Sequence, residues 1–177
     1  MSSGGASDAA LVYRGELNAV FDGCYSAHGD AKRGNRDGEA WTATAEALAA
    51  IAARHGFPYP GLEFRRNWED LAWNSHHDTL GGTSIHSVYE KSRGMYARVI
   101  ESGRAIANDA LRFLAARIDA PDGAIVVFNP IGWTRDAVVE FDMPAGLPPR
   151  GARAVAPGQP SAAVQAAPAG SGRGMFV

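Results

Sequence analysis

The sequence lacks the features that mark several large classes of protein. It has a single cysteine, Cys24, so no internal disulfide can form and a reducing compartment is the default expectation. Its 17 Lys and Arg residues against 19 Asp and Glu residues give a net charge of -2, without a basic block. Nucleic-acid binding depends on clustered positive charge, so nucleic acid is not expected as a partner.

Membrane and secretion signals are also missing. No apolar run approaches the roughly 18 residues that a membrane span needs. The first ten residues, MSSGGASDAA, lack the basic-then-apolar order of a secretion signal. The sequence therefore predicts a soluble, cytoplasmic protein without a membrane partner.

Two common catalytic motifs are absent as well. Ser26 and Ser84 have no GxSxG pattern around them, which a serine nucleophile on a strand-to-helix turn would need. The Gly-rich pieces are not followed by the GK[ST] of a phosphate-binding loop. Neither a serine hydrolase nor a nucleotide phosphate site is indicated.

What the chain does contain is helical periodicity. We expect a first helix from about Ala31 to just before Gly56, where Pro58 and Pro60 follow, and a second from Leu62 to about His76. A third, long helix is expected to begin at a cap formed by Thr83 or Ser84 and to end at the turn signals of residues 119–123. The apolar residues that recur at helical spacing in the first and third helices are Trp41, Ala45, Leu48, Ile51, Ala52, Ile85, Val88, Tyr89, Tyr96, Val99, Ile106, Phe113, Leu114 and Ile118.

Two glycines, Gly94 and Gly103, interrupt the third helix. Each weakens a helix by about 1 kcal/mol relative to Ala. We expect close packing against a neighbouring helix to compensate at both positions.

The pattern changes after Gly123. Residues 124–129 (AIVVFN) and 137–141 (AVVEF) read as two strands joined by a turn, and Pro, Gly and Ala dominate beyond Met143. The predicted fold is mainly α, with a three-helix bundle followed by a short β-hairpin that begins a β-domain. The predicted domains are an irregular lead-in (1–30), the three-helix domain (31–120), the start of a β-domain (121–145) and a low-complexity tail (146–177).

The most informative stretch is WNSHHDTLGGTS at residues 73–84. His76 and His77 are expected at the end of the second helix, with Asp78 opening the following loop. Adjacent helical residues point about 100° apart, so only one of the two histidines could face a given site. A simpler explanation is that histidine suits a helix C-terminus. A catalytic zinc usually has three protein ligands, and this stretch supplies one or two.

Two further candidates have ordinary explanations. His28 and Asp30 could combine with His77 and Asp78 in a self-contained metal site, but N-capping of the first helix explains Asp30 more simply. The three tryptophans Trp41, Trp68 and Trp73 could stack on sugars. At helical spacing such residues are more often part of the core.

Several motifs, in order, resemble the middle region of the glycoside hydrolase family 38 α-mannosidases. The matching pieces are RGELN at 14–18, GCYSAHGDAKRGNR at 23–36, WEDLAWNSHHDTLGGTSIHSVYE at 68–90 and VVFNPIGWTRDAVVEF at 126–141. The third resembles the family's histidine-aspartate motif, and the last resembles the start of its β-sandwich region. The resemblance thus implies that the predicted β-hairpin begins a truncated β-sandwich domain. The resemblance covers roughly residues 12–142.

The resemblance implies a function and roles for individual residues. In the family, an N-terminal β/α barrel carries the aspartate nucleophile and a metal-binding His-x-Asp, and the three-helix domain adds one histidine ligand. That ligand corresponds to His77, and Asp78 corresponds to a residue that contacts sugar hydroxyls, whereas His76 receives no role. The implied reaction is metal-dependent, retaining hydrolysis of terminal α-mannosides, with Zn²⁺ or another divalent cation shared with residues of the barrel.

No catalytic residue of the family falls within this sequence, because the barrel motifs are not found in it. We therefore expect a fragment of an α-mannosidase that is inactive and binds metal weakly without the barrel, supplied in cis or in trans. Two alternatives stay open: a non-catalytic helical module whose exposed apolar face binds a partner, and the self-contained metal site with His28 and Asp30.

Overall fold

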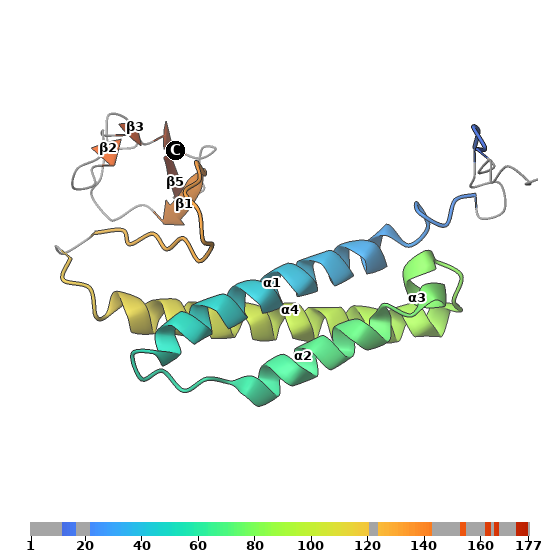
Figure 1. Cartoon of the computed structure of the whole chain (residues 1–177), viewed down its shortest axis with the longest axis horizontal. Helices are drawn as coiled ribbons and strands as arrows, with labels where there is room; N and C mark the ends of the chain where they lie inside the picture. The colour runs from blue at the N-terminus through green and yellow to red at the C-terminus, as the bar shows by residue number, and fades with distance from the viewer. Residues whose placement is uncertain are drawn as a thin grey trace, which may run out of the picture.

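Three long helices lying side by side form the main body of the protein. The computed structural model describes residues 12–16, 22–120 and 124–142, and the backbone of four short strands within 153–176. The long helices are α1 (Gly29–Ala53), α2 (Gly61–Asn74) and α4 (His86–Ala115), and a five-residue helix, α3 (His77–Gly81), lies at one end of the bundle (Figure 1). The chain is therefore mainly helical, as the sequence predicted.

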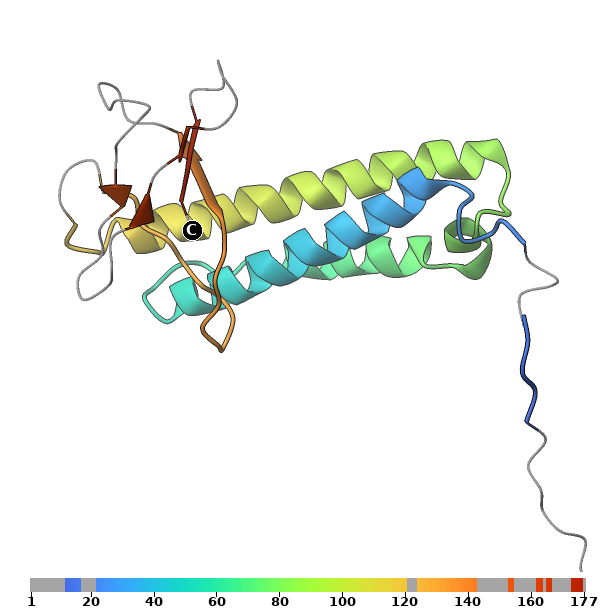
Figure 2. The same cartoon turned by 90° about the horizontal axis from the view of Figure 1, so that it is seen from above.

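The core is divided between the two ends of the bundle. One cluster lies toward the α3 end, and the other lies toward the opposite end, where Phe57, Phe113 and Phe128 pack against it. Small alanines of both helices line the contact between α1 and α4 in the cluster farther from α3. Figure 2 shows the two helices from above. The first cluster contains Ala31, Leu71, Tyr89, Tyr96 and Val99, and the second contains Ala45, Leu48, Ala49, Ala52, Phe64, Ala107, Ala110 and Leu114.

Polar contacts fix α4 relative to its neighbours. Arg93 of α4 pairs with Asp30 of α1 at 3.0 Å, and Arg98 pairs with Asp70 of α2 at 2.5 Å. Arg93, Asp30 and Arg98 are exposed and Asp70 is partly buried, so each pair contributes about 0.2–1 kcal/mol to stability. The two pairs connect α4 to α1 and to α2.

The two glycines of α4 differ in their surroundings. A Cβ at Gly103 would stand 3.0 Å from the Cβ and the backbone carbonyl carbon of Trp41 on α1. The close packing expected at this position is therefore confirmed. At Gly94 a Cβ would meet nothing within 4 Å, so the same expectation was wrong there.

Helix boundaries depart from the prediction around the histidine motif. The second helix ends at Asn74 rather than His76, and the additional helix α3 takes in His77 and Asp78. The long helix begins at His86 with Ile85 as its N-cap, so neither Thr83 nor Ser84 caps it. Thr83 and Ser84 instead donate their backbone N–H groups to the carbonyl of Asp78, which holds them in the turn after α3.

The predicted β-hairpin is wrong in its pairing. Residues 124–129 form no strand, whereas the second predicted strand is present as β1 (Val139–Asp142). Its partner is β5 (Arg173–Phe176), which pairs antiparallel with both β1 and β4 (Gln165–Ala166). The strands β2 (Arg153–Ala154) and β3 (Ala162–Ala163) form a separate antiparallel pair. Most of the predicted low-complexity tail lies outside the described residues.

Across the described residues, every helix is too short or too polar to cross a bilayer.

Candidate metal and sugar site

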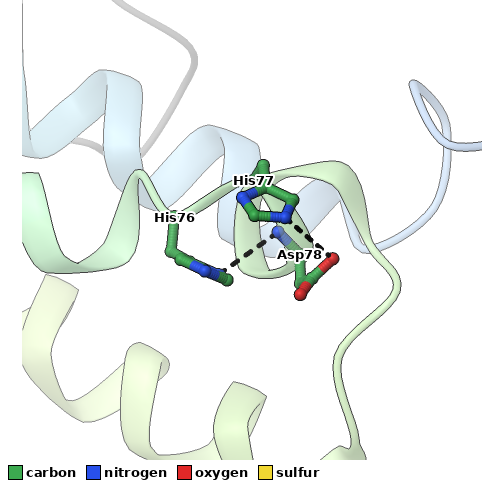
Figure 3. A group of neighbouring side chains, drawn as sticks. All are labelled: His76, His77 and Asp78. Atoms are coloured by element: carbon green, nitrogen blue, oxygen red, sulfur yellow. Dashed lines mark hydrogen bonds and ion pairs between the residues drawn. The ribbon is translucent and has the colours of Figure 1, made fainter.

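The histidine motif forms the short helix α3 and the residue before it. His76 has an extended backbone (φ -52, ψ 136) and is the N-cap of α3, where its ring Nδ1 accepts a hydrogen bond from the backbone N–H of Asp78 at 3.4 Å. His77 and Asp78 then occupy the first turn of the helix. Figure 3 shows the three side chains gathered on one side of this turn.

Both histidines lie near the same point, contrary to expectation. Their ring centroids are 4.3 Å apart, and a ligand atom from each of His76, His77 and Asp78 lies within 4.8 Å of the others. The predicted separation of about 100° assumed that both residues were helical. It fails because the extended backbone of His76 turns its ring back over α3.

The imidazole and carboxylate groups of these three residues are of the kinds that bind zinc. Zinc accepts imidazole nitrogen and carboxylate oxygen, and it usually takes four ligands. His77 Nε2 is 3.6 Å from Asp78 Oδ1, and the His77 side chain is 82% exposed. The His77 and Asp78 side chains are therefore open to solvent, where their donor atoms are accessible.

The loop after α3 closes on the backbone carbonyl of Asp78. Gly82, with a left-handed φ of 93°, ends the helix, and the N–H groups of Thr83 and Ser84 donate to that carbonyl at 2.9 and 3.1 Å. The Thr83 bond, together with the bond from the Gly82 N–H to the carbonyl of Thr79 at 3.3 Å, is the hydrogen-bonding pattern of a Schellman-type helix end. The Thr83 hydroxyl donates to Asp78 Oδ1 at 3.2 Å, which leaves the other carboxylate oxygen for a ligand.

His77 and Asp78 line a cleft of about 830 Å³ between α3 and α1. The wall on α1 carries both charges and an amide, which can exchange hydrogen bonds with a hydroxyl-rich ligand. The sequence did not mark the residues of this wall as functional, because their helical spacing places them only on the polar side of α1. The residues of the α1 wall are Lys32, Asn35, Arg36 and Glu39.

The self-contained site with His28 and Asp30 is not assembled. Among the described residues, the group of three or more possible ligands is His76, His77 and Asp78. Asp30 instead pairs with Arg93. The expected N-cap at Asp30 is also wrong, since α1 begins at Gly29 with His28 as its N-cap.

The tryptophans divide between core and surface. Trp41 packs against the core as predicted. Trp68 is 38% exposed and Trp73 is 66% exposed, so a core position was wrong for these two. The ammonium group of Lys91 lies 5.4 Å from the centre of the Trp73 ring.

Comparison with known proteins gives a family. The family described as alpha mannosidase middle domain matches residues 19–114, which is more than half of the chain. The chain therefore belongs to the α-mannosidases of glycoside hydrolase family 38, through their middle domain. This confirms the resemblance that the sequence motifs indicated.

Two curated proteins are similar over most of the chain. Alpha-mannosidase 2C1 of Homo sapiens is 29% identical over 143 residues, covering 79% of this chain and 14% of that protein. Alpha-mannosidase 2C1 of Mus musculus is 28% identical over 129 residues, covering 72% of this chain and 12% of that protein. The chain thus spans about a seventh of the length of these relatives.

Proposed function

We propose that this chain supplies one metal ligand, His77, and one sugar-contacting carboxylate, Asp78, to the active site of a retaining α-mannosidase. The observation that carries the proposal is the exposed pairing of these two residues at one end of a bundle of the mannosidase middle-domain family. A buried ring would have had no access to ligands from another domain.

Each residue has a distinct task in this proposal. The His77 imidazole holds a divalent cation, whose charge helps to bind sugar hydroxyls and to stabilise the transition state. Asp78, anchored through its backbone carbonyl and one carboxylate oxygen, accepts hydrogen bonds from sugar hydroxyls with the other oxygen. The nucleophile and the remaining ligands come from the barrel that the family carries.

The proposal predicts that the chain alone does not hydrolyse mannosides. The test measures 4-nitrophenyl α-mannoside turnover, with added zinc, by the chain alone and by the chain mixed with a separately expressed mannosidase barrel. We expect turnover only in the mixture. His77→Ala should lower this turnover by roughly 100-fold or more, as for the loss of a metal ligand or its support.

A matched control uses the neighbouring histidine. His76→Asn removes an imidazole but keeps an N-cap side chain for α3, because Asn is among the best N-caps. It should leave turnover in the mixture within a few fold. Robust turnover by the chain alone, or equal losses for the two variants, would contradict the proposed roles.

A non-catalytic interaction module is the second candidate. Leu62 and Trp73 are 69% and 66% exposed, and a spacing of eleven residues places them on the same side of α2. This apolar pair could contact a partner protein. If the chain works with the barrel, replacing both residues by Gln should weaken its association with the barrel. If the chain is an interaction module, it should instead associate with an unrelated partner, and His77→Ala should leave that association unchanged.

A further inference from the structure

Tyr89 lies beneath α3 and the loop that follows it. It belongs to α4 and is 1% exposed. Its hydroxyl donates a hydrogen bond to the carbonyl of Asp78 at 3.2 Å and accepts one from the backbone N–H of Ser84 at 3.1 Å. One phenolic oxygen thus connects the two ends of the segment 78–84 to the long helix.

The ring of His28 stacks on the ring of Tyr89. The two rings are parallel, with centroids 3.5 Å apart and planes 6° apart. His28 has a left-handed backbone (φ 47), which is uncommon for a residue with a side chain. The turn before α1 is therefore shaped to place this ring against Tyr89.

The neighbours of His28 hold that turn in place. The Lys32 ammonium donates to the carbonyl of Ala27 at 2.6 Å, and Asp30 pairs with Arg93 of α4. On the opposite side, a Cβ at Gly82 would stand 2.8 Å from the Cβ of Ala27. The turn before α1 and the loop after α3 thus pack directly against each other.

We propose that Tyr89 and His28 are positioning residues for the His77–Asp78 pair. Tyr89 fixes the Asp78 backbone to α4, and the stacked His28 ring keeps the phenol in place. The proposal rests on the proposed function, because it is His77 and Asp78 that a metal and a sugar would use. Such groups need to be held to within about 0.5 Å, and five-residue α3 is too short to provide that rigidity alone.

The proposal also accounts for the histidine that the sequence left unexplained. His28 and Asp30 carry ligand-type atoms but make contacts within the bundle: His28 with Tyr89, and Asp30 with Arg93. They act on the site through other residues.

The test measures amide hydrogen exchange in the full chain. Tyr89→Phe keeps the ring and its stacking but removes the hydroxyl. We expect exchange at residues 79–84 to become about tenfold faster, as for the loss of one or two hydrogen bonds, while exchange within α1 and the interior of α4 stays unchanged. His28→Asn, which tolerates the left-handed backbone but lacks a ring, should accelerate the same amides.

A matched control lies two turns along the same helix. Tyr96 is 3% exposed, and its hydroxyl has no hydrogen-bond partner among the described residues. Tyr96→Phe should leave exchange at residues 79–84 as in the unmodified chain. Unchanged exchange in Tyr89→Phe, or equal acceleration in Tyr96→Phe, would overturn the positioning role.

A zinc titration separates this proposal from the proposed function. Zinc is added to each variant while the backbone amide and histidine ring resonances are followed by NMR, and Tyr89→Phe should weaken binding several fold relative to Tyr96→Phe. If His77→Ala binds zinc as the unmodified chain does, the proposed function fails, and exchange alone decides the role of Tyr89. If His77→Ala loses zinc and Tyr89→Phe does not weaken it, the positioning proposal is overturned.

Discussion

Gly103 of α4 lies directly against the backbone of Trp41 on α1. A Cβ at this glycine would stand 3.0 Å from both the carbonyl carbon and the Cβ of Trp41, and 3.1 Å from the carbonyl oxygen. Backbone atoms cannot swing aside as the end of a flexible side chain can. The approach of α1 to α4 at this level therefore requires glycine.

Gly103→Ala should destabilise the bundle, by about 1–3 kcal/mol as for overpacking of a core. Gly94→Ala is the matched control in the same helix, because a Cβ there meets nothing within 4 Å. It should stabilise the protein by about 0.5–1 kcal/mol through helix propensity. Urea unfolding of the two variants checks both signs, and equal effects would contradict the packing described here.

Tyr96→Phe should raise stability at neutral pH. The Tyr96 hydroxyl is buried without a hydrogen-bond partner among the described residues, and such a group costs about 1–3 kcal/mol. Urea unfolding at pH 7 measures the change. A marked loss of stability in Tyr96→Phe would show that the hydroxyl has a partner.

The same residue should make stability fall at alkaline pH. Burial, with a smaller contribution from the charge of Glu39, raises the pKa of Tyr96 from 10.0 to about 12. Between these values the unfolded chain loses the phenolic proton and the folded chain keeps it, so stability decreases as pH rises. The advantage of Tyr96→Phe over the unmodified chain should therefore grow from pH 9 to pH 11, and a constant advantage would argue against this cause.

The Asp30–Arg93 pair should give a small acid-dependent contribution. The hydrogen bond from Arg93 lowers the pKa of Asp30 below its usual 3.8, against an opposing effect of desolvation. The contribution is complete above pH 3.8 and is lost as pH falls through the lower pKa of the folded state. NMR titration of the Asp30 carboxyl should show a higher pKa in Arg93→Gln, and an unchanged pKa would exclude the pair as the cause.

Periodicity predicted the long helices because their core faces repeat with little interruption. Ala45 and Leu48, for example, are both buried where the spacing placed them. Exposed apolar residues broke the rule at Ile51 and Trp73, where nothing in the local pattern separates a core side chain from a surface one. The partner of β1 could not be predicted, because strand pairing depends on residues distant in sequence.

The site was predicted in composition but not in geometry. The motif identified His77 and Asp78 as the residues of interest, and their roles stay predictions. Propensity continued the second helix through His76, and it could not foresee that the extended backbone of this residue would begin a new helix. The contribution of Tyr89 was hidden because its hydroxyl acts across eleven residues of sequence on a backbone carbonyl.

Zinc titration of the chain, followed by NMR, determines whether the His77 imidazole binds a metal ion. We expect weak, saturable binding that perturbs the His77 ring and is lost in His77→Ala. His55→Ala, which removes an exposed histidine outside the described ligand group, should bind zinc as the unmodified chain does. Binding that survives His77→Ala undiminished would contradict metal binding by His77.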